Sequence, residues 1–251
     1  MIIIDAGNTN TVLAIYINNK VKNIKRIDSK DLKKFEYEIN NYFKIKKKYL
    51  KNNFFFCILS SVVPKLSIIV KKTSLKNNFI FFNLTAKNIP FNIKFNYDKK
   101  SIGADRLANT VALVENKISN CLVIDFGTAT TFDLIKNNSY NGGLIFPGII
   151  VSHNSLIKNA ALLKKTKIIK LNKLIYNNTK NSIQSGFYWG YLSAINGIII
   201  KLSKEYKFKP KIILTGGLAH IFKSKIINNP IIKENLTLEG LGIIGKKINE
   251  K

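Results

Sequence analysis

The chain contains two similar turns, and each follows a short apolar run. The first reads Asp5-Ala-Gly-Asn-Thr9 after three isoleucines, and the second reads Asp125-Phe-Gly-Thr128 after Cys121-Leu-Val-Ile. Glycine lets the backbone of such a turn approach a ligand, and hydroxyl and amide groups donate to phosphate oxygens. One Asp-x-Gly turn is more often structural than functional. Two of them, 120 positions apart (125 minus 5), predict a phosphate clamp in a duplicated fold.

The apolar patterns predict the same succession of elements twice. Strands at 2–4, 11–17 and 21–27 come first, followed by alternating helices and strands. A second strand-turn-strand at 121–134 is followed by the same alternation, so the boundary falls near 117–120. We therefore expect an α/β protein with mixed sheets, divided into halves at 1–117 and 118–251.

The net charge of +27 comes almost entirely from lysine. Lysine, isoleucine and asparagine are enriched together, and all three have A/T-rich codons, so base composition explains the charge at least as well as a partner does. Proteins that read nucleic acid specifically favour arginine for bidentate contacts. The chain has only Arg26 and Arg106. We expect no specific nucleic-acid binding, and Arg106 becomes a candidate functional residue.

The sequence predicts a cytoplasmic protein. No apolar run approaches the roughly 18 residues that a membrane span needs, and the N-terminal isoleucine run has no basic leader or cleavage site. Cys57 and Cys121 lie in apolar, strand-like runs, which is typical of buried thiols in a reducing compartment.

The segment Gly103-Ala-Asp105-Arg106 opens a predicted helix. An acid at this position could merely complement the helix dipole. It could also take a proton from a substrate hydroxyl, beside a guanidinium that clamps a carboxylate or phosphate. The rarity of arginine favours the functional interpretation. The sequence has no P-loop motif, and neither half has a G-x-G-x-x-G turn after its opening strand.

Other polar residues are expected to be ordinary. His153 and His220 are the only histidines, and no cluster has zinc-ligand spacing. Asp133 is either turn-facing or a support for the second turn. Thr215-Gly-Gly217 follows a buried run and either packs or admits part of a nucleotide.

In their order and spacing, these motifs resemble type III pantothenate kinases, of the acetate and sugar kinase/Hsp70/actin superfamily. The resemblance covers nearly the whole chain, through Asp5–Thr9, Ser60–Pro64, Gly103–Arg106, Asp125–Thr128, Gly142–Gly148, Thr179–Gly186, Thr215–Gly217 and Leu236–Gly240. It implies two ribonuclease H-like, actin-like ATPase halves with the active site in the cleft between them. It also implies ATP-dependent phosphorylation of pantothenate to 4′-phosphopantothenate, the first step of coenzyme A biosynthesis.

The resemblance also implies a role for each motif. Asp105 would be the general base on the pantothenate hydroxyl, and Asp125 would bind a monovalent cation, K⁺ or NH₄⁺. Asp5 would lie near Mg²⁺ and the transferred phosphoryl group. The residues implied to bind ATP are Asp5, Ala6, Gly7, Asn8, Thr9, Asn10, Thr11, Val12 and Thr128. The residues implied to bind pantothenate are Tyr97, Gly103, Ala104, Asp105, Arg106 and Thr179.

The family is typically a homodimer whose substrate pocket is completed across the interface, so a second copy of the chain is an expected partner. One segment departs from the family pattern: Tyr97-Asp-Lys-Lys-Ser-Ile lacks the usual proline after the tyrosine and is one residue shorter.

Three other functions stay open. They are a regulatory or binding protein on the same scaffold, another small-molecule kinase of the superfamily, and a basic nucleic-acid binder. The intact Asp5, Asp105, Arg106 and Asp125 argue against the first. The Gly-Ala-Asp-Arg and Thr-Gly-Gly contexts favour pantothenate over a sugar or an acyl group.

Overall fold

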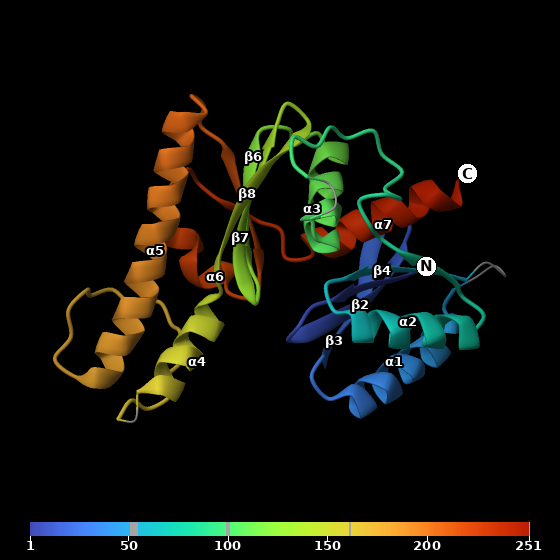
Figure 1. Ribbon diagram of the computed structural model, residues 1–251, viewed down its shortest axis with the longest axis horizontal. Coiled ribbons are helices and arrows are strands. Elements are labelled where there is room, and N and C mark those ends of the chain that lie inside the picture. Colours follow the sequence, from blue (N-terminus) through green and yellow to red (C-terminus); the bar gives the residue numbers. More distant parts are fainter. Residues whose placement is uncertain (51–54, 99–100, 161, 251) are drawn as a thin grey trace. The chain divides into compact units, whose positions relative to one another are not determined.

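The computed structural model describes residues 1–50, 55–98, 101–160 and 162–250, which form two compact units (Figure 1). Unit 1 comprises Met1–Ser119, Asn138–Tyr140 and Asn235–Lys251, and unit 2 comprises Asn120–Asn137 and Asn141–Glu234. Unit 1 is thus assembled from three separate stretches of chain. The division into halves at 1–117 and 118–251 stays a prediction.

Unit 1 contains a mixed five-stranded sheet in the order β3-β2-β1-β4-β5. The central strand β1 is antiparallel to β2 and parallel to β4, which is in turn parallel to β5. The strands are β1 (Ile2–Ala6), β2 (Asn10–Ile17), β3 (Lys20–Asp28), β4 (Phe56–Ser61) and β5 (Ile80–Asn83).

Helices cover both faces of this sheet because its central strands are apolar on both sides. Ile2 and Ile4 pack toward α1 and α2, whereas Ile3 packs toward α3 and α7. Asp31 caps α1, since its Oδ1 accepts a hydrogen bond from the Lys34 backbone N–H at 3.1 Å. The helices of unit 1 are α1 (Leu32–Lys47), α2 (Pro64–Lys76), α3 (Ala104–Glu115) and α7 (Leu236–Asn249).

Unit 2 repeats the same topology. Its sheet has the order β10-β9-β6-β7-β8, in which β6 is antiparallel to β7 and parallel to β9, just as β1 is to β2 and β4. The predicted α/β class with two mixed sheets is therefore confirmed. The strands are β6 (Cys121–Phe126), β7 (Ala129–Lys136), β8 (Ser139–Pro147), β9 (Lys211–Gly216) and β10 (Ile231–Ile232).

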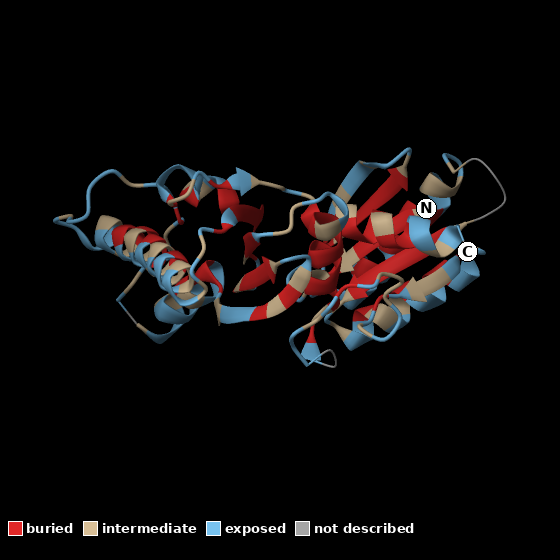
Figure 2. Cartoon of the chain, turned by 90° about the horizontal axis from the view of Figure 1, so that it is seen from above, coloured by how far each residue is buried: buried red, intermediate tan, exposed pale blue. Residues whose placement is uncertain are grey.

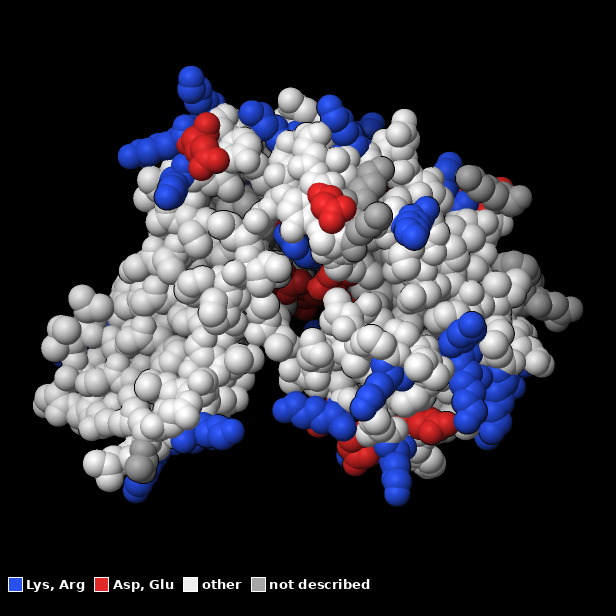
Figure 3. Space-filling model, viewed as in Figure 1, with Lys and Arg blue, Asp and Glu red and all other residues white. Residues whose placement is uncertain are grey.

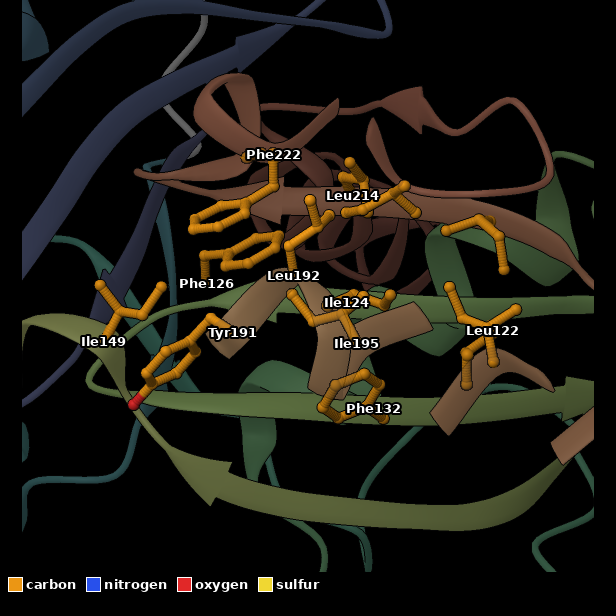
Figure 4. Packing of buried hydrophobic residues seen from close by; sticks show 14 of the residues in the cluster. Leu122, Ile124, Phe126, Phe132, Ile149, Tyr191, Leu192, Ile195, Leu214 and Phe222 are labelled. Atoms are coloured by element: carbon orange, nitrogen blue, oxygen red, sulfur yellow. The ribbon is translucent and has the colours of Figure 1, made fainter. Parts of the chain in front are cut away.

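The core of unit 2 is aromatic and branched aliphatic (Figure 4). Phe126 at the end of β6 stacks on Phe222, with ring centroids 5.3 Å apart and planes inclined by 5°. Tyr188, Tyr191 and Ile195 pack against the sheet from the long helix α5. The helices of unit 2 are α4 (Ile149–Asn159), α5 (Thr179–Glu205), α6 (Ala219–Phe222) and the 3₁₀ turn η2 (Lys223–Lys225).

The central strands of both sheets are buried, whereas the edge strands β3, β5 and β8 and the outer faces of the helices are largely exposed (Figure 2). Lysine and arginine side chains are dispersed over the face shown in Figure 3, which carries no continuous basic patch. None of the described helices has the length and apolarity required to cross a membrane.

The observed elements differ from the predicted ones mainly at two strand ends. We expected Asp5 and Asp125 to lie in the turns, but β1 extends to Ala6 and β6 extends to Phe126. The reason is the parallel neighbour: Asp5 pairs with Ser60 and Asp125 pairs with Thr215, so both ladders continue past the polar residues.

Candidate active site

The first turn is held at both ends by backbone hydrogen bonds. Gly7 N–H donates to the Asn10 carbonyl at 3.1 Å, which closes the turn between β1 and β2. Ser29 N–H donates to the Thr9 carbonyl at 3.1 Å, and the hydroxyls of Thr11 and Ser29 are 2.9 Å apart. Between these ties, residues 8–10 are exposed. A rigid turn with exposed hydroxyl and amide groups can bind phosphate.

The second turn has the same construction but is one residue shorter. Gly127 N–H donates to the Ala129 carbonyl at 3.1 Å. Phe126 pairs with Thr130, whereas Ala6 in the first hairpin pairs with Thr11. The two turns therefore match at their Asp-x-Gly segments and diverge immediately after them.

Thr128 in the second turn lies against the N-terminus of α4. A methyl group at Gly148 would overlap the Thr128 carbonyl, so only glycine permits this approach. Tyr191 fixes the helix start, because its hydroxyl donates to the Pro147 carbonyl at 3.1 Å and lies 2.6 Å from Ser152 Oγ. A helix N-terminus presents unpaired N–H groups and a positive dipole end to anions. Thr128 thus lies beside this helix N-terminus, and its binding of ATP stays a prediction.

Asp125 lies against a bare stretch of β9 backbone. Gly216 has φ +85°, and a methyl group there would come within 2.6 Å of Asp125 Oδ1. The neighbouring Thr215 pairs with Asp125 across the parallel ladder. This cradle supplies carboxylate and hydroxyl oxygens, which suit a hard cation. The residues present therefore fit the predicted monovalent cation.

Two carboxylates share an electrostatic environment in unit 1. Asp105 lies in the first turn of α3, where its Oδ1 accepts a hydrogen bond from the Arg106 N–H at 2.8 Å. Burial, together with the charge of Asp105, raises the pKa of Asp5 to about 7, while a hydrogen bond from Ser60 and the charge of Arg26 oppose this shift. A pair of neighbouring carboxylates, one with a raised pKa, is a candidate functional site, and the role of Asp5 near Mg²⁺ stays a prediction.

Gly103 and Ala104, the other residues of this motif, shape the start of α3. Gly103 is the N-cap residue, and a methyl group there would lie 2.5 Å from Asp105 Oδ1. Ala104 begins the helix and is buried. Any larger residue at position 103 would therefore displace the carboxylate.

Arg106 is buried beside two aromatic rings, both of which its guanidinium approaches. Its Cζ lies 5.9 Å from the ring centroid of Tyr97 and 5.7 Å from that of Tyr140. The two rings meet edge to face, with centroids 5.8 Å apart. The structure thus brings Tyr97 and Arg106 together, while their binding of pantothenate stays a prediction, and it adds Tyr140, which had no signal in the sequence. Lys99 and Lys100 of the shortened segment after Tyr97 lie outside the described residues.

Thr179 is the first residue of α5 and is exposed. The preceding Asn178 caps the helix by accepting a hydrogen bond from Asn181 N–H at 2.9 Å. Thr179 belongs to unit 2, and Arg106 belongs to unit 1. The predicted role of Thr179 in holding the substrate stays a prediction. So does the location of the site in a cleft between two halves.

The remaining polar candidates have local partners. His153 is buried with Nε2 2.9 Å from Thr166 Oγ1, and exposed His220 pairs with Glu234 at 2.7 Å. Asp133 is buried and accepts a hydrogen bond from Thr131 Oγ1 at 3.3 Å. Across the described parts of the chain, no cluster of three or more histidine, cysteine, aspartate or glutamate side chains is arranged to hold a metal ion.

Solved structures share this fold at low sequence identity. A conserved Baf family protein from Campylobacter jejuni matches with a TM-score of 0.64 and 22% identity, covering 100% of both chains. The ethanolamine utilization protein EutJ from Carboxydothermus hydrogenoformans matches with a TM-score of 0.59 and 12% identity, covering 97% of this chain and 89% of that one. An N-acetylglucosamine kinase candidate from Porphyromonas gingivalis matches with a TM-score of 0.56 and 12% identity, covering 100% of both chains. These likenesses show that the fold with two mixed five-stranded sheets is shared with known structures.

Sequence comparison gives the family. A model of type III pantothenate kinases matches residues 1–201. A type III pantothenate kinase of Pelagibacter ubique is 36% identical over 250 residues, covering 96% of this chain and 97% of the relative. Another from Geobacter sulfurreducens is 33% identical over 255 residues, covering 100% of both. The chain therefore belongs to the type III pantothenate kinase family.

Proposed function

We propose that this protein transfers the γ-phosphoryl group of ATP to the hydroxyl of pantothenate, with Asp105 as the general base. Family membership makes it an ATP-dependent pantothenate kinase of coenzyme A biosynthesis. The observation that carries the assignment of roles is the arrangement at the start of α3. There the charge of Asp105 acts on Asp5, and the adjacent Arg106 packs against the rings of Tyr97 and Tyr140.

The chemistry asks little of the protein beyond positioning and charge neutralisation. Asp105 accepts the proton of the pantothenate hydroxyl as that oxygen attacks phosphorus. Arg106 donates hydrogen bonds to oxygen atoms of pantothenate through its planar fork. Tyr97, which is 39% exposed, forms the solvent-facing side of this substrate site, with Gly103 and Ala104 at its base.

ATP is held by the two turns. Residues 5–12 form the first phosphate loop, and Thr128 contributes beside the N-terminus of α4. Asp125 binds K⁺ or NH₄⁺ in the cradle that Gly216 leaves open. Mg²⁺, when bound beside Asp5, neutralises charge on the phosphates.

We further propose that the protein acts as a cytoplasmic homodimer. Unit 2 exposes large apolar side chains that a second copy of this chain would cover. They lie on β8, on α4 and in the segment between α4 and α5, and they are Leu144, Ile145, Ile150, Val151, Leu162 and Ile175. The two buried thiols, whose pKa values burial raises to about 12, fit a reducing compartment. Sedimentation of the native chain and of Ile145→Lys tests the dimer, and a monomeric native chain would contradict it.

A coupled assay of ADP release tests the activity directly. The acceptors are pantothenate, a hexose, acetate and none, each with K⁺ and Mg²⁺ present. We expect turnover with pantothenate alone. Turnover only with a sugar or acetate would make the protein another kinase of the superfamily. ATP binding without turnover on any acceptor would favour a regulatory protein on the same scaffold.

A further inference from the structure

We propose that Tyr140 is a positioning residue for the reaction: its buried ring holds the Arg106 guanidinium in the orientation that binds pantothenate. The proposal rests on the proposed role of Arg106 in holding the substrate. Tyr140 lies at the start of β8, in a different part of the sequence from the Gly-Ala-Asp-Arg motif.

The two rings around Arg106 differ in their exposure. Tyr140 has no exposed surface, whereas Tyr97 is 39% exposed. Both ring centroids lie within 6 Å of the guanidinium carbon, the range in which a cation is attracted to an aromatic face. Of the two rings beside Arg106, Tyr140 is therefore the buried, fixed one, and Tyr97 is the one next to solvent.

The backbone of Tyr140 is fixed by a short parallel bridge. Its N–H donates to the Lys94 carbonyl at 2.9 Å, and its carbonyl accepts from Asn96 N–H at 2.8 Å. The Phe95 ring packs on the Tyr140 ring with centroids 5.8 Å apart. Tyr97 lies two residues after Phe95, so the same bridge helps to position both rings beside Arg106.

This arrangement acts on substrate binding. An arginine side chain loses considerable rotamer freedom when it is ordered. A side chain that is already ordered in the free enzyme loses less conformational entropy when the ligand binds. Loss of the Tyr140 ring should therefore weaken binding of pantothenate and leave binding of ATP largely unchanged.

The test compares Tyr140→Leu with Tyr140→Phe in steady-state kinetics of the full chain. We expect Tyr140→Leu to raise KM for pantothenate about tenfold, in line with the strength of a desolvated cation–π contact. KM for ATP should change much less. Tyr140→Phe keeps the ring and should recover most of the lost affinity. Equal rises in both KM values, or no recovery in the phenylalanine variant, would overturn the proposal.

A matched control separates positioning from packing. Phe56 belongs to the same hydrophobic cluster as Tyr140, is 3% exposed, and stacks on Phe82 rather than on Arg106. Phe56→Leu should lower the melting temperature without changing KM for pantothenate. If Phe56→Leu raises KM for pantothenate as much as Tyr140→Leu does, the effect of Tyr140→Leu is general destabilisation and not positioning of Arg106.

A double-mutant cycle with Arg106→Gln completes the test. We expect Arg106→Gln to raise KM for pantothenate, and Tyr140→Leu to add little in that background. If both single changes raise KM and their effects multiply, Tyr140 does not act through Arg106. If Arg106→Gln still phosphorylates pantothenate with an unchanged KM, Arg106 does not hold the substrate and the proposal for Tyr140 is overturned. The assignment as a kinase is tested separately by the acceptor assay.

Discussion

Ser60 on β4 donates a hydrogen bond to the carboxylate of Asp5 on β1, with 3.0 Å between Oγ and Oδ1. The two strands are parallel, and the two residues face each other in register. Burial and the nearby charge of Asp105 raise the pKa of Asp5 to about 7, and the bond from Ser60 works against them. The ionisation of Asp5, near the end of β1, is thus balanced near neutral pH.

Removing the Ser60 hydroxyl should shift the pH dependence of the kinase. Ser60→Ala deletes a donor that favours ionised Asp5, so the pKa of Asp5 rises further. We expect the acid limb of the kcat profile to move to higher pH, measured from about pH 5 to pH 9.

The neighbouring serine provides a control for this change. The Ser61 hydroxyl donates to the Val63 carbonyl at 3.1 Å rather than to a carboxylate. Ser61→Ala should leave the limb in place. An unchanged limb in Ser60→Ala would mean that another group sets it.

Asp5 should also make folding stability depend on pH. Its folded-state pKa of about 7 exceeds its ordinary value of 3.8, so the folded protein binds this proton more tightly than the unfolded chain. This contribution is fully present below about pH 4 and is lost as pH rises through about 7. Asp5→Asn lacks it. Without nucleotide or metal, the melting temperature of the wild type should therefore fall relative to that of Asp5→Asn as the pH rises from about 4 to about 7. A relative rise would mean that the pKa of Asp5 is lowered by folding.

Asp105→Asn should lose most of its turnover and keep its nucleotide. General base catalysis contributes about 10²–10⁴-fold, so kcat should fall by this factor. Calorimetric titration with ATP should give a dissociation constant near that of the wild type. Asp28→Asn, an exposed acid on β3 that accepts a hydrogen bond from Lys30 N–H, is a control for charge removal. Turnover near normal in Asp105→Asn would remove this residue from the mechanism.

The cation cradle can be closed with one methyl group. A methyl group at position 216 would lie 2.6 Å from Asp125 Oδ1, and the backbone there has φ +85°. Gly216→Ala should raise the K⁺ concentration needed for half-maximal activity. At Gly217 a methyl group has nothing within 4 Å, so Gly217→Ala is the matched control. Equal activity of the wild type in sodium-only and potassium buffer would count against Asp125 as a cation ligand.

Replacing glycine by alanine should have opposite effects on the free energy of unfolding in two helices. On α7, a methyl group at Gly240 would overlap the Ala108 carbonyl of α3, and overpacking of this kind costs about 1–3 kcal/mol. On α5, a methyl group at Gly197 meets nothing within 4 Å, so alanine should stabilise the helix by up to about 1 kcal/mol. Urea denaturation of the two variants measures both effects, and equal effects would contradict the close packing of α7 on α3.

Local patterns in the sequence were sufficient for much of this structure. The order of strands and helices follows from apolar periodicity, and the twin turns follow from Asp-x-Gly. Tyr140 could not be found in this way, because its role depends on a pairing with Phe95 in a loop without regular pattern. The shorter second turn was equally hidden, since only strand register reveals it. Interactions between distant segments leave no periodic signal.

The placement of α7 has a consequence for the order in which the protein is made. Thr237 on α7 donates a hydrogen bond to Asn109 on α3 at 2.9 Å, across 128 residues of chain. The apolar face of α7 also covers the sheet that contains Asp5. On the ribosome, unit 2 has all its strands once residue 234 has emerged, whereas the N-terminal sheet still lacks α7 on the face that α3 also covers. The residues proposed to carry out the chemistry are thus made early and reach their final surroundings late, after residues 236–249 have been synthesised.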